Sequence, residues 1–181
     1  MDELGKSNSK GTRNQTLPEI IEDLKKLLNW KMSVKEKESI YDGKLENGLS
    51  GTRRIAELTE EQLLKDINKL DSKTKNMLMT MIVRIYSYLQ NMENTTEDSQ
   101  YTLREMMDDL IRLSKWESII NKKESTGEDG LLATREIAKR EEEQLVKNIK
   151  RLNPSATEVL KTMIGKIYNF LQPKKEEHDE R

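Results

Sequence analysis

The chain has 181 residues, of which 36% are charged and 34% hydrophobic, and its 32 basic and 33 acidic side chains leave a net charge of −1. It contains no cysteine, which excludes disulfides, thiolate catalysis and cysteine-ligated zinc. No apolar run is long enough for a signal peptide or a membrane span, so we expect an intracellular protein, cytoplasmic or nuclear, that has no membrane partner.

The sequence also matches itself. Residues 16–30 match residues 102–116 at an offset of 86, and residues 52–90 match residues 134–172 at an offset of 82. We therefore predict an all-α protein made by tandem duplication of a three- to four-helix module whose helices are joined by Gly-rich loops. The expected organisation is a disordered tail (1–15), helical repeat 1 (16–90), an acidic linker (91–101), helical repeat 2 (102–173) and a charged tail (174–181).

The first helix of repeat 1 is predicted to begin with Thr16 as its N-cap and Pro18 in its first turn. Apolar residues then recur at helical spacing in both repeats: Leu17, Ile20, Ile21, Leu24, Leu27 and Leu28 in the first, and Leu103, Met106, Met107, Leu110 and Leu113 in the second. Each stripe leads to a tryptophan, Trp30 or Trp116. We predict that both anchor the core or the contact between repeats, and the alternative is an exposed anchor for a partner.

A segment rich in turn-forming residues follows in each repeat. It contains Asp42-Gly43, Asn47-Gly48 and Ser50-Gly51 in repeat 1, and Gly127 and Asp129-Gly130 in repeat 2. Because glycine supplies the positive φ angles that turns need, we predict loops here, with Leu49 and Leu131 turned inward.

The second helical region is predicted to open at Thr52 or Thr134. In repeat 1 its apolar stripe is Ile55, Leu58, Leu63, Ile67 and Leu70. Thr59-Glu60-Glu61-Gln62 fits a capping box, which predicts a break after Leu58. Repeat 2 has Arg140-Glu141 at this place and no such cap, so either the repeats differ or the break is weak.

The last helix of each repeat has the clearest start, with Asn153 before Pro154 in repeat 2 and Asp71-Ser72 in repeat 1. Its core face is Leu78, Met81, Ile82, Ile85 and Leu89, repeated as Leu160, Met163, Ile164, Ile167 and Leu171. In repeat 1 this helix is apolar nearly all round, which is typical of a helix buried on more than one side. The second side would meet the other repeat or a second molecule.

Enzymatic chemistry finds little support in the sequence. The one histidine is His178, and there is no glycine-rich phosphate loop. We predict no catalytic residues, no cofactor, no metal and no small-molecule substrate. The acidic clusters Glu60-Glu61, Asp108-Asp109 and Glu141-Glu142-Glu143 are interpreted as residues of helix N-termini or polar faces, where acidic side chains are favourable.

The function that we predict is a non-enzymatic helical interaction module, meaning an adaptor, assembly subunit or regulator. Its partner would be another protein or a second copy of the chain, in a homodimer. The candidate contact surface consists of exposed or edge apolar positions: Trp30, Met77, Met79, Val83, Tyr86, Tyr88, Trp116 and Tyr168.

A nucleic-acid-binding regulator is the alternative. The segment 134–140 and its counterpart 52–56 resemble the first half of a helix-turn-helix, although the turn glycine is absent. Two related basic faces would contact phosphates: Arg53, Arg54, Lys65, Lys69, Arg135, Lys139, Lys147 and Arg151. Acidic residues interleaved with these cations oppose the hypothesis. Recent duplication, or an ion pair within the bundle, would equally account for an arginine at both position 53 and position 135.

Overall fold

The computed structural model describes residues 15–41, 46–92 and 101–172. These residues form six α-helices and no strand, so the all-α prediction is confirmed for them. The tails, the predicted loop at Asp42-Gly43 and most of the predicted linker lie outside the described residues. The helices are α2 (Leu17–Tyr41), α3 (Glu46–Asn68), α4 (Ser72–Asn91), α5 (Leu103–Thr126), α6 (Leu131–Ile149) and α7 (Pro154–Leu171).

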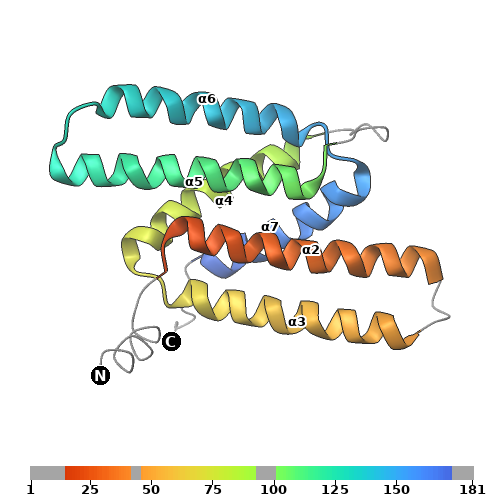
Figure 1. The fold of residues 1–181 in the computed structure, drawn as a ribbon. Coiled ribbons are helices and arrows are strands. Elements are labelled where there is room, and N and C mark those ends of the chain that lie inside the picture. Colours follow the sequence, from red (N-terminus) through yellow and green to blue (C-terminus); the bar gives the residue numbers. More distant parts are fainter. Residues whose placement is uncertain (1–14, 42–45, 93–100, 173–181) are drawn as a thin grey trace, which may run out of the picture.

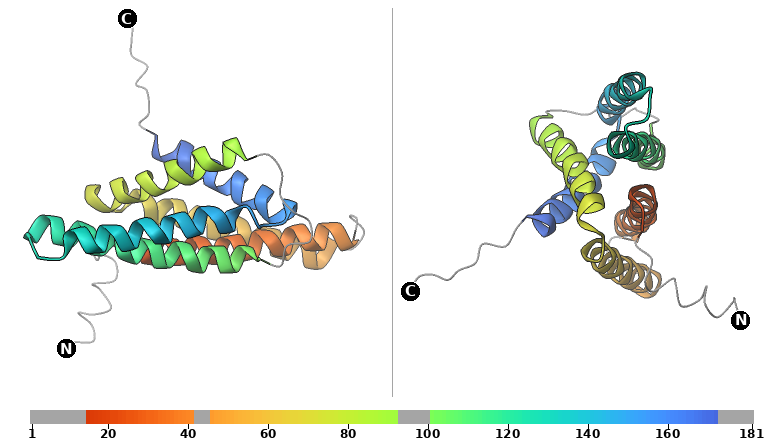
Figure 2. Two further views of the ribbon diagram at one scale, coloured as in Figure 1. Left: turned by 90° about the horizontal axis from the view of Figure 1, so that it is seen from above. Right: turned by 90° about the vertical axis from the view of Figure 1, so that its left-hand side faces the viewer.

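The helices form two layers. In one layer, α3, α2, α5 and α6 lie side by side in that order, and neighbouring helices run in opposite directions (Figures 1 and 2). In the other layer, α4 and α7 cross each other over one face of the first layer, as the two views of Figure 2 show. The last helices of the two repeats therefore meet each other.

Local capping explains where several helices begin. The backbone N–H of Glu19 donates to the Thr16 hydroxyl, and the Glu19 carboxylate accepts from the backbone N–H of Thr16, as in a capping box. Asn153 caps α7 by accepting from the N–H of Ala156 at 2.8 Å, with Pro154 as the first helical residue. Asp71 does the same for α4. The predicted starts of these three helices are confirmed.

The predictions for α3 were wrong in two respects. Gly48 and Gly51 lie inside the helix and not in a loop, and the helix passes Leu58 without a break. Thr59 caps nothing, because its hydroxyl donates to the carbonyl of Ile55 one turn earlier. The glycines lack a positive φ here, so they weaken the helix without ending it.

The glycine-containing turn of repeat 2 exists as predicted. Gly127 ends α5 with φ 72° and Gly130 precedes α6 with φ 86°, both in the left-handed region that glycine occupies without steric cost. Leu49 is buried in repeat 1, as expected, whereas its counterpart Leu131 is half-buried.

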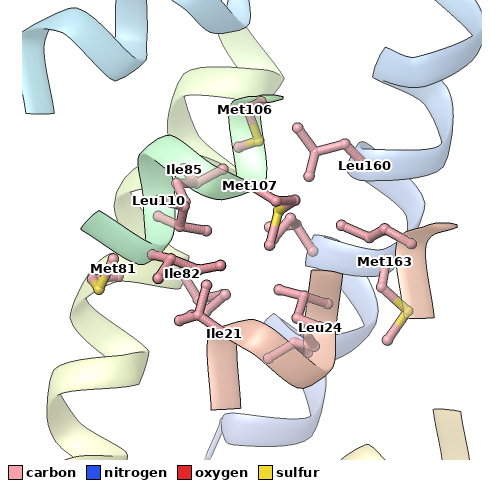
Figure 3. Packing of buried hydrophobic residues seen from close by; sticks show 14 of the residues in the cluster. Ile21, Leu24, Met81, Ile82, Ile85, Met106, Met107, Leu110, Leu160 and Met163 are labelled. Atoms are coloured by element: carbon pink, nitrogen blue, oxygen red, sulfur yellow. The ribbon is translucent and has the colours of Figure 1, made fainter. Parts of the chain in front are cut away.

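One hydrophobic core joins both repeats. Figure 3 shows side chains of α2, α4, α5 and α7 meeting at its centre, including Ile21, Ile82, Leu110 and Met163. All the core positions predicted for α4, through Leu89, are buried and so confirmed. In α7 the predicted core positions are buried through Ile167. The prediction that Trp30 anchors the core was wrong, because 37% of this residue is exposed. Trp116 packs only against the edge of the core.

Positions that the two sequence matches align make equivalent contacts. Tyr86 of α4 and Tyr168 of α7 stack on each other with ring centroids 4.2 Å apart and planes 7° apart. Across the layers, Lys166 of α7 pairs with Glu60 of α3, and Arg84 of α4 pairs with Glu142 of α6. The last helix of each repeat is thus held against the second helix of the other.

Candidate functional site

An apolar crevice of about 450 Å³ opens between α4, α5 and α6. Its floor is made by Leu110 and Leu113 of α5 and by Leu145 and Ile149 of α6, all nearly completely buried. These residues recur every three or four positions and so lie on one face of each helix. The wall on the α4 side is formed by Met81, Val83, Arg84, Ile85, Ser87, Tyr88 and Asn91.

The crevice exists because the two repeats pack unequally. In repeat 1, α7 lies close against α2, where the aligned residues Leu24, Leu27, Leu63 and Ile67 are buried as deeply as the floor residues themselves. In repeat 2, α4 makes few close backbone approaches to α5. The volume is within the range of protein ligand sites, which are mostly apolar with a few polar groups.

Tyr88 brings an unsatisfied polar group to this wall. Its hydroxyl is buried and has no hydrogen-bond partner among the described residues, although the rest of the side chain is half-buried against the core. An orphaned buried hydroxyl destabilises a fold unless a ligand or water satisfies it. The aligned residue of α7 is Phe170, which has no hydroxyl, so this feature belongs to the crevice side alone.

The crevice ends in charged residues. Arg84 Nη1 and Glu142 Oε1 at its edge are 2.8 Å apart, with half of the arginine side chain exposed. Glu117 lies one turn beyond Leu113 on the same face of α5. Burial raises the pKa of Glu117, and the neighbouring carboxylates of Glu142 and Glu124 raise it further, while Arg84 opposes them.

The aligned cluster in repeat 1 has the opposite balance of charge. Glu60 lies 2.8 Å from the ammonium of Lys31 and 3.2 Å from that of Lys166. Burial alone would raise the pKa of Glu60, but these two cations hold it below its ordinary value. At the offset of 86, Lys31 aligns with Glu117. Repeat 1 therefore has two cations, Lys31 and Lys166, around the carboxylate of Glu60, whereas repeat 2 has one cation, Arg84, beside the two carboxylates of Glu117 and Glu142.

A second polar cluster surrounds Asp109. Its carboxylate accepts hydrogen bonds from the Tyr101 hydroxyl, from Arg112 at 2.5 Å and from the Asn148 amide at 3.1 Å. Burial opposes ionisation, but these bonds lower the pKa of Asp109, and burial raises the pKa of Tyr101. In repeat 1, Gln15 donates to the aligned Asp23 at 3.0 Å. The cluster ties the chain before α5 to α5 and α6, which is a structural role.

The acidic clusters lie within their helices and not at helix N-termini, because α3 and α6 begin earlier than expected and Asp108-Asp109 lies in the second turn of α5. Glu61, Asp108 and Glu143 are exposed on polar faces, which agrees with the other part of the prediction, whereas Glu60, Asp109 and Glu142 are partly buried in ion pairs. No group of three or more acidic or histidine side chains among the described residues is arranged to hold a metal ion.

The predicted apolar contact surface is only partly assembled. Val83 and Tyr88 line the crevice, whereas Tyr86 and Tyr168 are occupied with each other. Met77 packs against the core, and Met79 is half-buried on another face of α4. Trp30 and Trp116 belong to the first helices of the two repeats and do not line the crevice.

The predicted basic faces are interrupted by ion pairs. Arg53 binds Glu38 at 2.6 Å and the aligned Arg135 binds the aligned Glu124, so both arginines clasp a helix hairpin. Arg151 lies over the ring of Tyr101, 5.3 Å from its centroid. The remaining candidates are exposed: Arg54, Lys65 and Lys69 on α3 and its end, and Lys139 and Lys147 on α6.

Sequence reasoning missed Glu117, Glu142 and the crevice floor as site residues. One signal was available: Glu117 takes an apolar-stripe position of α5 and replaces a lysine of the other repeat.

Comparison of the chain with protein-family models, with curated proteins and with solved structures finds no match. Within the described ranges, no helix has the length and apolar character needed to cross a membrane.

Proposed function

We propose that the chain is a non-enzymatic helical interaction module that holds an apolar segment of a partner protein in the crevice between α4, α5 and α6. The observation that carries this proposal is the crevice itself, an apolar volume of about 450 Å³ between three helices. Apolar side chains of a helix or strand gain free energy by filling such a volume.

The architecture behind the crevice is, in our proposal, a duplicated three-helix module folded as a pseudo-dimer. The stacked pair Tyr86 and Tyr168, the two cross-layer ion pairs and the two arginine clasps occupy aligned positions and support this origin. Such a pair of equivalent surfaces is typical of a two-fold contact. In this proposal the crevice arises because the position of α4 departs from the two-fold symmetry between the repeats.

Nucleic-acid binding has weaker support. Arg53 and Arg135 are neutralised by glutamates, and the exposed cations alternate with acidic residues such as Glu61 and Glu143. An absorbance ratio at 260 and 280 nm typical of pure protein is expected for the purified chain at low salt.

The test uses short peptides selected on the full chain by phage display and titrated by fluorescence anisotropy. Val146→Trp fills the crevice from its rim, and we expect it to weaken peptide binding about tenfold or more. Lys147→Trp is the control, since it places the same side chain on the exposed neighbouring position. Equal peptide affinity for the wild type and Val146→Trp, or a failure to select any peptide, would contradict the proposal.

Light scattering on the same samples tests the identity of the partner. A dimer that Val146→Trp converts to a monomer would make the partner a second copy of this chain. A monomeric wild type would leave a different protein as the partner.

A further inference from the structure

The acidic end of the crevice indicates what its ligand carries. The crevice floor runs along α5 through Leu110 and Leu113, and along α6 through Ile149 and Leu145 towards Glu142 at the edge. Glu117 follows Leu113 one turn further along α5, just beyond the lining residues. Because α5 and α6 are antiparallel neighbours, both rows end on the same side. An apolar chain lying in the crevice would therefore have one end beside two carboxylates.

The aligned place in repeat 1 shows how this fold satisfies such a carboxylate. There Glu60 receives the ammonium groups of both Lys31 and Lys166. In repeat 2, Arg84 takes the part of Lys166, but Glu117 stands where Lys31 would be. The cluster of Glu117, Glu142 and Arg84 is thus one cation short of the arrangement in repeat 1.

We propose that the partner segment supplies this cation: a lysine or arginine next to apolar side chains places its charged group between Glu117 and Glu142 while the apolar side chains fill the crevice. This inference rests on the proposed function and specifies its ligand. The ligand's ammonium or guanidinium takes the position that Lys31 has in repeat 1, and its apolar part covers Leu113, Leu145 and Val146. Burial of Glu117, with Glu142 and Glu124 near it, leaves its charged form only partly compensated by Arg84, so a further cation beside it is favourable.

The experiment separates charge recognition from apolar binding with three probes of eight carbon atoms each: octylammonium, octanol and octanoate. Each is titrated into the full, isotope-labelled chain below its micellar concentration, and amide shifts of Leu113 and Val146 report occupancy. We expect octylammonium to bind about fivefold more tightly than octanol, in keeping with one partly exposed ion pair, and octanoate to bind most weakly.

Glu117→Lys gives the matched variant, since it installs the residue that repeat 1 has at this place and that the fold accepts there. It is expected to abolish the preference for octylammonium and to leave octanol binding unchanged. Glu117→Gln should reduce the preference without adding charge. Glu136→Lys, on an exposed position of α6, is the control for net charge and should keep the preference.

The outcomes distinguish the two proposals. If octanol and octylammonium bind equally well to the wild type, or if Glu117→Lys keeps the preference, the cation is not recognised and the apolar crevice remains. If none of the three probes binds, the crevice is not a binding site, and the proposed function fails together with this inference.

Discussion

Two acidic residues of α5, Asp109 and Glu117, become partly buried on folding, and their pKa values move in opposite directions. Burial opposes ionisation at both. At Asp109 three hydrogen-bond donors overcome it, whereas at Glu117 burial prevails over the opposing charge of Arg84, and the carboxylates of Glu142 and Glu124 add to it. The hydrogen bonds to the charged form of Asp109 account for most of the difference. One carboxylate therefore stabilises the fold at neutral pH and the other opposes it.

At this scale we predict that Glu117→Gln stabilises the chain at neutral pH by a few tenths of a kcal/mol, a value kept small by solvent screening. The folded pKa of Glu117 is above its unfolded value, so the wild type loses stability as the pH rises from about 4.5 through that folded pKa. The advantage of the glutamine variant should grow over the same interval. Urea unfolding between pH 3.5 and 7 measures it.

Asp109→Asn provides the opposite control. Because the folded pKa of Asp109 lies below its unfolded value, its contribution is present above about pH 4 and is lost as the pH falls through the folded pKa. The asparagine variant should be less stable than the wild type at pH 7, with a gap that narrows on acidification. Parallel pH profiles for the two variants would contradict both assignments.

Among the helices, α3 shows where local sequence misleads. Asn-Gly and Ser-Gly are turn signals, yet Glu46–Asn68 is one helix because Leu49, Ala56, Leu63 and Ile67 bury its inner face against the core. Tertiary packing outweighs the cost of two glycines. The turn at Gly127 and Gly130 in repeat 2 has no such packing and needs positive φ angles.

A pair of alanine substitutions tests this difference. Gly51→Ala should stabilise the chain by up to about 1 kcal/mol, because Gly51 is helical and nothing lies within 4 Å of an added Cβ. Gly127→Ala should destabilise it by about 1 kcal/mol, because alanine is strained at φ 72°. Chemical denaturation of both variants measures the changes. A loss of stability in Gly51→Ala would contradict the assignment of this segment to a helix.

How much the sequence could predict follows from the range of each interaction. The caps at Thr16, Asp71 and Asn153 and the apolar stripes depend on residues a few positions apart, so they were predictable. The layer order and the crevice depend on how closely α4 and α7 approach helices that are distant in the chain, which no local pattern encodes. The exposure of Trp30 has the same origin. The contrast between Lys31 and Glu117 was visible in the aligned repeats, but its meaning needed Glu142 and Arg84 beside it.

For the whole molecule, the shared core means that neither repeat has a complete interior of its own. In the full chain α2 packs on α5 and α4 crosses α7. Residues 1–95 alone would expose the buried faces of α2 and α4, including Ile21 and Ile82. These faces pack in the full chain against faces made by the aligned residues of repeat 2.

We therefore expect the fragment 1–95 to melt at a lower temperature than the full chain, and to form dimers as its concentration rises. Thermal unfolding by circular dichroism and sedimentation equilibrium give the two measurements. The full chain should unfold in one transition. A monomeric fragment with the melting temperature of the full chain would show that the repeats are independent domains.

The crossing of α4 over α7 has a consequence for the covalent path of the chain. Each half reaches across the other through the Tyr86–Tyr168 stack and the ion pairs of Arg84 and Lys166. A protease cut introduced between Met92 and Tyr101 would therefore leave two pieces that stay clasped, and the separately expressed pieces would reassemble. The molecule is in this sense a split protein, whose two halves associate without a covalent link between them.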